Sequence, residues 1–126
     1  MSETVLWTNA SPTSSLATQN LTLTDSMFNY SYLGVYYRFT TSDTSEARTI
    51  VIPSELTLHN PKFVQGFLGS LSITVGSGTT TEWTRFFCRA DDTGNLLYMY
   101  SCTKTTGGSG GQNNSYLIPT KIVGIK

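Results

Sequence analysis

The stretch from Glu82 to Thr103, EWTRFFCRADDTGNLLYMYSCT, decides the fold of this chain. It contains two runs rich in aromatic and apolar residues, Glu82–Ala90 and Asn95–Thr103. The intervening DTGN, residues 92–95, supplies the aspartate, glycine and asparagine that tight turns favour. Alternation of side chains with a period of two indicates strands. The stretch therefore predicts a β-hairpin.

The first strand of this hairpin is apolar or aromatic on both of its faces. One face carries Thr84, Phe86, Cys88 and Ala90, and the other carries the candidate interface or ligand-binding residues Trp83, Arg85, Phe87 and Arg89. We expect one face to fill the core and the other to expose Trp83 and Phe87 beside the two arginines. An exposed patch of this kind usually binds a partner or a ligand. The alternative is that another part of the chain, such as residues 61–68, covers it.

The rest of the chain repeats the strand pattern. Further runs with alternating apolar positions are Gln19–Asp25, Tyr32–Thr41, Arg48–Pro53, Ser70–Val75 and Tyr116–Ile125. No window has convincing helical spacing, and clusters of turn-forming residues separate the runs. Seven or eight strands at intervals of roughly ten residues predict an all-β fold, an antiparallel β-sandwich of the jelly-roll-like kind. The length of 126 residues fits one domain, so residues 1–126 are expected to form a single β-sandwich.

The composition argues against several classes of function. Eight Lys and Arg balance eight Asp and Glu, which gives a formal net charge of zero, and charged residues make up only 13% of the chain. Without an excess of positive charge, binding of nucleic acid is not expected. No apolar run reaches the ~18–20 residues that cross a bilayer, so membrane insertion is not expected. The polarity comes largely from neutral hydroxyl groups, since the sequence contains 15 Ser and 21 Thr.

The two cysteines lie on opposite strands of the predicted hairpin. With the turn centred near residue 93, Cys88 faces Tyr98 and Cys102 faces Thr84. The cysteines are then four residues out of register, which is too far for the ~5.5–6 Å between Cα atoms that a disulfide requires. We expect two small, buried, reduced thiols.

Residues that carry catalysis or bind metals are few and scattered. His59 is the only histidine, and its position beside a turn in LHNPK (residues 58–62) predicts a solvated loop residue. The adjacent Asp91 and Asp92 precede a glycine and fit a turn better than a catalytic pair. The sequence therefore predicts no catalytic residue, no metal site and no cofactor. An enzyme is the least favoured of the functions considered.

Hydroxyl and amide groups beside aromatic rings suit contact with sugars. Trp83, Tyr36 and Tyr100 are candidates for such a contact, although aromatic residues at alternating strand positions more often pack in a core. The low-complexity segment Gly107–Ser115 has the composition of a flexible loop. Such a loop either contributes to binding or simply connects two strands.

Both ends of the chain resemble a module of bacteriophage tail-fibre and tail-tip proteins. That module opens with Leu-Trp and a small polar loop containing proline, continues with a tyrosine-rich strand pair, and closes with a strand similar to LIPTKIVGIK (residues 117–126). The residues that carry the resemblance are Leu6, Trp7, Asn9, Pro12, Leu21, Leu23, Tyr32, Val35, Tyr37, Ile118, Pro119, Lys121, Ile122, Gly124, Ile125 and Lys126. The resemblance spans the whole chain, but the middle is not diagnostic.

The resemblance implies a compact β-sandwich built into a virion. It further implies a homo-oligomer, with a trimer favoured, contacts with other virion proteins, and in some cases contact with a host cell-surface saccharide. The absence of a shaft region upstream of Met1 leads us to expect either a fragment or a small free-standing virion protein. The alternatives kept open are a capsid decoration protein and a free carbohydrate-binding module.

Overall fold

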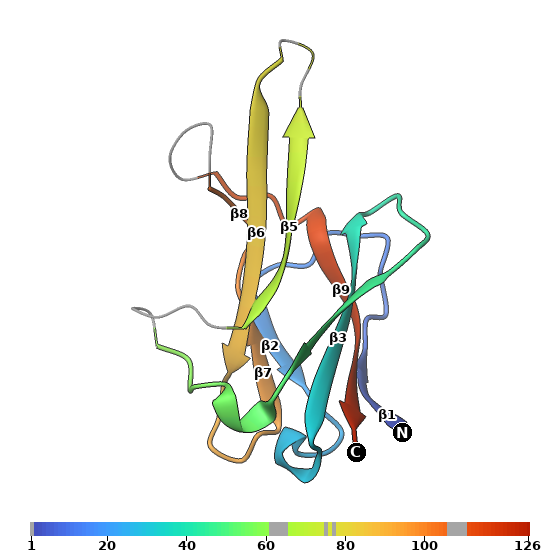
Figure 1. Cartoon of the computed structure of the whole chain (residues 1–126), viewed down its shortest axis with the longest axis vertical. Coiled ribbons are helices and arrows are strands. Elements are labelled where there is room, and N and C mark those ends of the chain that lie inside the picture. Colours follow the sequence, from blue (N-terminus) through green and yellow to red (C-terminus); the bar gives the residue numbers. More distant parts are fainter. Residues whose placement is uncertain (1, 61–65, 75, 77, 106–110) are drawn as a thin grey trace.

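The computed structural model describes residues 2–60, 66–74, 76, 78–105 and 111–126. Within these residues, nine strands form two antiparallel sheets that pack against each other (Figure 1). Sheet A has the order β1 (Glu3–Thr8), β9 (Tyr116–Ile125), β3 (Tyr32–Thr40), β4 (Ala47–Val51). Sheet B has the order β2 (Gln19–Thr22), β7 (Leu96–Met99), β6 (Thr80–Arg89), β5 (Phe67–Thr74), and the short β8 (Thr103–Lys104) pairs with β6. The predicted all-β sandwich is confirmed.

The seven strands predicted from alternation are present, with two differences. The run Asn95–Thr103 is divided into β7 and β8, and β1 was not predicted. Strand β1 has little alternation of its own and is defined by its pairing with β9, which brings Val5 opposite Val123. Two short 3-10 helices, η1 (Met27–Asn29) and η2 (Pro53–Glu55), lie between strands. No helix in the described part of the chain has the length and apolar character needed to span a membrane.

The β6–β7 hairpin has the predicted register at its turn. Cys88 pairs with Tyr98, as expected, whereas Thr84 pairs with Thr103 instead of Cys102. The shift by one residue coincides with the break between β7 and β8, where the chain leaves the ladder. Both cysteines are buried and free, which confirms the expected pair of thiols.

The turn of this hairpin is held by the carboxylate of Asp91. Its Oδ1 accepts hydrogen bonds from the backbone N–H groups of Gly94 (2.9 Å), Asn95 (3.0 Å) and Leu96 (3.3 Å). Gly94 has a φ of +77°, a conformation that glycine adopts without strain. Desolvation opposes ionisation of Asp91, but the bonds from Thr93 and from these N–H groups prevail and lower its pKa. Asp91 therefore serves the turn, as the sequence predicts, while the exposed Asp92 pairs with Arg89 at 3.6 Å.

The core lies between the sheets and is closed by strands from both ends of the chain. Its fully buried side chains include Leu6, Leu33, Val35, Phe87, Leu97, Met99, Ile118 and Ile122. Strand β9 lies between β1 and β3, so the last strand of the chain is central in sheet A. Figure 1 shows the two termini side by side at one end of the sandwich.

The expectation that Trp83, Arg85, Phe87 and Arg89 form an exposed face was wrong. These residues point between the sheets, because the register pairs Phe87 with Met99 and Arg89 with Leu97, both of which are fully buried. Phe87 and Arg85 are 0% exposed. The outer face of β6 instead carries Phe86 and Cys88. Phe87 and Arg85 are therefore part of the buried interior, whereas Trp83 packs against the core and, like Arg89, is only partly buried.

Arg85 is tolerated in the core because backbone carbonyls receive its guanidinium. Its Nε donates to the carbonyl of Tyr100 at 2.8 Å, and its Nη2 donates to that of Leu16. Its Nη1 lies 3.5 Å from the carbonyl oxygens of Tyr116 and Leu117. Burial lowers the pKa of Arg85 to about 10, so the group keeps its charge at neutral pH. This single side chain joins the β1–β2 connection, the end of β7 and the start of β9.

A candidate ligand-binding groove

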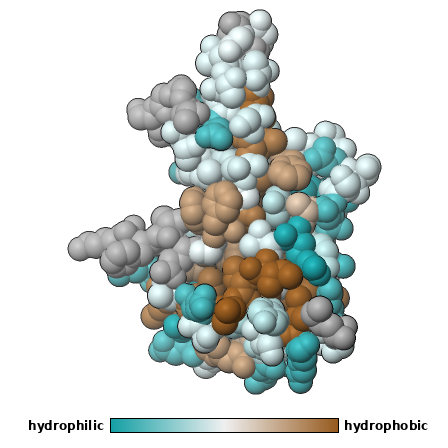
Figure 2. Space-filling view, viewed as in Figure 1, coloured by the Kyte–Doolittle hydropathy of each residue, from teal (hydrophilic) through white to brown (hydrophobic). Residues whose placement is uncertain are grey.

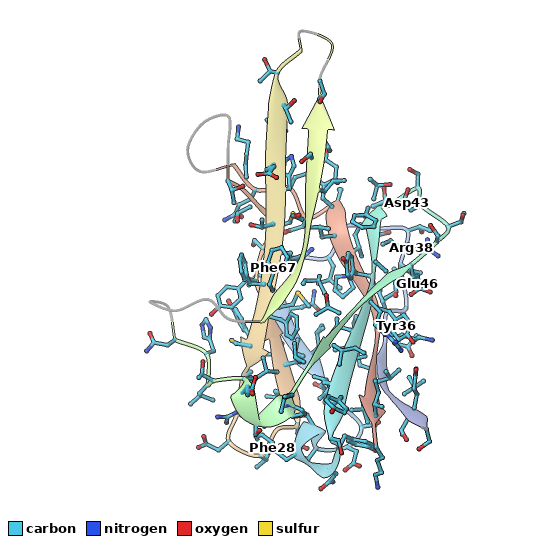
Figure 3. All side chains as sticks on the ribbon, in the orientation of Figure 1. Phe28, Tyr36, Arg38, Asp43, Glu46 and Phe67 are labelled. Atoms are coloured by element: carbon cyan, nitrogen blue, oxygen red, sulfur yellow. The ribbon has the colours of Figure 1, made fainter. Side chains whose placement is uncertain are left out.

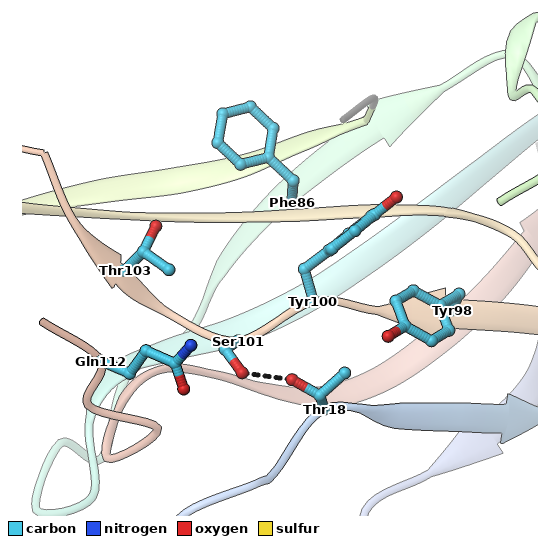
Figure 4. A pocket seen from close by; sticks show the side chains of 7 residues that line it. All are labelled: Thr18, Phe86, Tyr98, Tyr100, Ser101, Thr103 and Gln112. Atoms are coloured by element: carbon cyan, nitrogen blue, oxygen red, sulfur yellow. Dashed lines mark hydrogen bonds between the residues drawn. The ribbon is translucent and has the colours of Figure 1, made fainter. Parts of the chain in front are cut away.

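An open cavity of about 520 Å³ lies on the outer face of sheet B. We call it the aromatic groove, and Figure 4 shows the side chains that line it: Thr18, Phe86, Tyr98, Tyr100, Ser101, Thr103 and Gln112. The volume falls within the ~300–1,000 Å³ of typical ligand sites. The lining comes from β6, β7 and β8 and from the β1–β2, β7–β8 and β8–β9 connections. The rigid sheet thus supplies the floor, and loop residues supply the rim.

The aromatic side chains project outward because of strand alternation. Phe86 and Cys88 lie on the outer face of β6, and Tyr98 lies opposite Cys88 on β7. Tyr100 follows directly after β7, and its N–H still donates to the carbonyl of Phe86 at 3.0 Å. The rings of Tyr98 and Tyr100 meet edge to face, with centroids 4.8 Å apart and planes at 81°. Two walls of different orientation result, which can contact two faces of a ligand.

His59 supports both tyrosine walls from outside the sheet. Its backbone N–H donates to the carbonyl of Arg89 at 2.7 Å, which docks the residues around His59 along the end of β6. Its ring stacks on Tyr98 at a centroid distance of 3.9 Å and an interplanar angle of 25°. Its Nδ1 is 3.0 Å from the Oη of Tyr100. The prediction of a solvated loop histidine was therefore wrong, because the turn after η2 returns His59 to the sheet.

Cys88 completes this support and is only 2% exposed. Its Sγ lies 3.6 Å from Tyr100 Oη, to which it donates, and 3.8 Å from His59 Nδ1. Burial raises the pKa of the Cys88 thiol. Burial together with the neighbouring Cys88 raises the pKa of Tyr100 far above its ordinary value. Cys88 and Tyr100 therefore stay protonated and uncharged at neutral pH, and Cys88 and His59 together hold the Tyr100 ring in place.

The opposite rim of the groove consists of neutral polar groups. The hydroxyls of Thr18 and Ser101 hydrogen-bond to each other, as the dashed line in Figure 4 shows. The side chains of Thr103 and Gln112 lie beside them. Gln112 belongs to the predicted loop Gly107–Ser115, of which residues 107–110 lie outside the described residues. The groove therefore combines an aromatic side with a hydroxyl and amide side.

Of the six residues predicted to form an interface or ligand site, only Tyr100 lines this groove. Tyr36 lies on the outer face of sheet A, the other layer of the sandwich, as Figure 3 shows. There the Tyr36 ring lies beside Lys121, whose Nζ is 4.5 Å from the ring centre, and the Tyr36 Oη donates to Glu3 at 3.1 Å. Trp83, Arg85, Phe87 and Arg89 lie on the inward face of β6. The structure does not bring the six together.

Sequence reasoning missed Phe86, Tyr98 and His59. The predicted register already placed Tyr98 opposite Cys88, so choosing the aliphatic Leu97 and Met99 as the core side would have put Tyr98 outside. Nothing in the sequence indicates that His59 folds back onto the sheet. Among the described residues, no group of three or more His, Cys, Asp and Glu side chains is placed to hold a metal ion.

Comparison with known proteins gives no match, whether to a family model, to a curated protein or to a solved structure.

Proposed function

We propose that this chain is a non-catalytic recognition module of a bacteriophage tail fibre or tail tip, and that its aromatic groove contacts a glycan on the host surface. The observation that carries the glycan part is the groove itself. Aromatic rings can pack against the C–H face of a sugar ring, while hydroxyl and amide groups exchange hydrogen bonds with its hydroxyls. Phe86, Tyr98 and Tyr100 supply the rings, and Thr103 and Gln112 supply polar groups.

The firm support behind the tyrosines favours binding. A ligand that meets already ordered walls loses less conformational entropy of the protein on binding. Tyr98 is stacked on His59, and Tyr100 is held by His59 and Cys88. The groove therefore has the preorganised character expected of a recognition site.

The tail-fibre part of the proposal rests on the resemblance at the two ends of the chain. Most of the residues that carry it lie in β1, β9 and β3, which are neighbours in sheet A, whereas Leu21 lies in β2 of sheet B. Gly124 lets the ring of Tyr30 lie against the backbone of β9, where an added Cβ would come within 2.5 Å of that ring. The motif thus corresponds to a structural framework, and the groove on sheet B lies in the other layer.

The arrangement of Cys88 and His59 supports a function without covalent chemistry. A cysteine nucleophile needs a lowered pKa and partial exposure. Cys88 is buried and its pKa is raised, although the imidazole is only 3.8 Å away. The pair is therefore better suited to hold Tyr100 than to attack a substrate.

The proposed homo-oligomer, with a trimer favoured, would form where the edge strands β4 and β5 meet. Ile50 and Ile52 are 47% and 40% exposed there, and both line a hollow of about 300 Å³. Figure 2 shows hydrophobic surface gathered over the end of β4. Edge strands and exposed apolar side chains are the features that subunit contacts cover. We propose that a second copy of this chain covers them.

Binding to an array of host-surface glycans, followed by titration calorimetry, tests the glycan part. Tyr100→Ala should weaken binding about tenfold, the factor that corresponds to ~1.4 kcal/mol. Tyr32→Ala, which removes a 45% exposed tyrosine on sheet A, should leave binding unchanged and serves as the control. Equal binding by both variants would contradict the assignment of the groove.

Location on the virion and the oligomeric state need separate measurements. Immunogold labelling of virions should mark the tail, and labelling of the capsid would instead support a decoration protein. The groove equally favours a free carbohydrate-binding module, which an absence of label from virions would support.

Analytical ultracentrifugation tests the oligomeric state. It should show an oligomer that Ile50→Glu dissociates. The control Val5→Glu, at a 51% exposed position on β1, should leave the oligomer intact. A wild-type monomer at high concentration would remove the oligomer from the proposal.

A further inference from the structure

The charge of the aromatic groove points to the class of its ligand, an inference that rests on the proposed glycan binding. We infer that the groove takes a neutral saccharide and discriminates against sugars that carry a carboxylate. Its seven lining residues are three aromatic residues, three hydroxyl residues and one amide, none of which carries a formal charge. The two groups that contact the Tyr100 hydroxyl, the thiol of Cys88 and the ring of His59, are not among the lining residues.

The arginines and the lysine nearest the groove in sequence are directed elsewhere. On β6, Arg85 and Arg89 point inward, where Arg85 donates to backbone carbonyls and Arg89 donates to the carbonyls of Leu56 and Asp91. Lys104 pairs with Trp83 and, by strand alternation, faces away from its neighbour Thr103. The Lys104 side chain lies against Gly111, and no cation of β6 or β8 is among the side chains that line the groove.

The one charged side chain on the outer face of β6 is negative. Alternation along β6 puts Glu82 on the same face as Thr84 and Phe86. Glu82 is exposed and lies beside Ser72 of β5, whose Oγ donates to its Oε1 at 3.4 Å. A carboxylate on the ligand would find no cation among the lining residues, and Glu82 adds a like charge farther along the same face of β6.

The cost of an unpaired charge explains the discrimination. A carboxylate that leaves water without a partner loses hydration that neutral groups cannot replace. Sugar hydroxyls, in contrast, find donors and acceptors in Thr103, Ser101 and Gln112. Proline-rich peptides also bind in aromatic grooves, but a rim of four neutral polar side chains matches a ligand that is itself rich in hydroxyls.

The test compares pairs of oligosaccharides that differ only in the oxidation of a hydroxymethyl group to a carboxylate, such as glucose-based and glucuronate-based chains. Isothermal titration at neutral pH should show the neutral member binding at least about tenfold more tightly, the factor that ~1.4 kcal/mol represents. Gln112→Arg should raise affinity for the acidic member, because it places a guanidinium on the exposed rim. Ser45→Arg, an equal charge at an exposed position in the β3–β4 connection, should not.

Each result separates this inference from the proposed function. Equal or tighter binding of the acidic member by the wild type would overturn the neutral-sugar inference and leave glycan binding intact. An equal effect of Gln112→Arg and Ser45→Arg would show a general charge effect and would overturn the role of the groove. Binding of a proline-rich peptide with no binding of any saccharide would overturn both.

Discussion

Replacing Arg85 with alanine removes the buried guanidinium that joins three separate segments of the fold. In the wild type, this group donates to the carbonyls of Leu16 and Tyr100 and reaches those of Tyr116 and Leu117. In the described part of the chain, the salt bridges formed are Arg48–Glu3 and Arg89–Asp92, so Arg85 depends on carbonyl oxygens and not on a carboxylate. The variant leaves those oxygens without a donor inside the core.

The magnitude follows from three terms. Each well-placed buried carbonyl that loses its donor costs ~1–3 kcal/mol, and the Leu16 and Tyr100 carbonyls both qualify. Loss of the side-chain stem adds a cavity term of ~2 kcal/mol or more. Dehydration of the guanidinium no longer opposes folding, and the fall of its pKa from 12.5 to about 10 sets this gain at about 3 kcal/mol. These terms sum to an expected net loss of stability of about 1–5 kcal/mol.

Urea unfolding followed by tryptophan fluorescence measures this loss, with Trp7 and Trp83 as probes. Arg85→Met should cost ~2 kcal/mol less than the alanine variant, because it refills the volume and avoids the cavity term but still leaves the carbonyls without donors. It also keeps the test informative if the alanine variant does not fold. Two variants as stable as the wild type would refute the idea that Arg85 holds the segments together.

Three further predictions concern other parts of the sandwich. Gly124→Ala should displace the Tyr30 ring and lower the stability by ~1–3 kcal/mol. It should also raise the pKa of Asp25, because the hydrogen bond from Tyr30 lowers that pKa in the wild type. NMR titration of Asp25 measures this change, and an unchanged pKa would show that the ring stays in place. Burial raises the pKa of Cys102 from 9.0 to about 11, so its contribution to stability should be complete below pH 9 and lost as the pH rises towards 11. Between pH 9 and pH 11, the free energy of unfolding of the wild type should therefore fall by more than that of Cys102→Ala. Parallel curves of unfolding free energy against pH for the two proteins would contradict this. Asp91→Ala should lower the free energy of unfolding in urea by ~1–2 kcal/mol, because the turn loses its hydrogen bonds to the carboxylate. Unchanged stability would contradict the role of Asp91 in the turn.

The hairpin that decides the fold could be predicted because two kinds of signal agree there. The turn residues fix where the chain reverses, and that position alone sets Cys88 opposite Tyr98. Strand β9 was predicted with its observed bounds, Tyr116–Ile125, because it is rich in apolar and β-branched residues, although its burial is nearly continuous and does not alternate. Strand β1 has no comparable pattern and depends on pairing with β9, a contact that links the two ends of the chain.

The orientation of β6 could not be inferred from that strand alone. Both of its faces carry large apolar residues, and the two arginines of one face suggested the surface. The structure buries that face because the backbone carbonyls around Arg85 satisfy its charge, which local sequence does not reveal. The groove was missed for the same reason, since Phe86 and Tyr98 become surface residues only when Phe87 turns inward.

The central claim is that the aromatic groove on sheet B binds a saccharide. The most direct test is to add a neutral oligosaccharide that binds on the array and to map the changes in backbone amide resonances of the labelled protein. The largest changes should fall on Tyr98, Tyr100, Ser101, Thr103 and Gln112, with little change around Tyr36 on sheet A. Changes confined to sheet A, or an absence of changes at saturating sugar, would contradict the account.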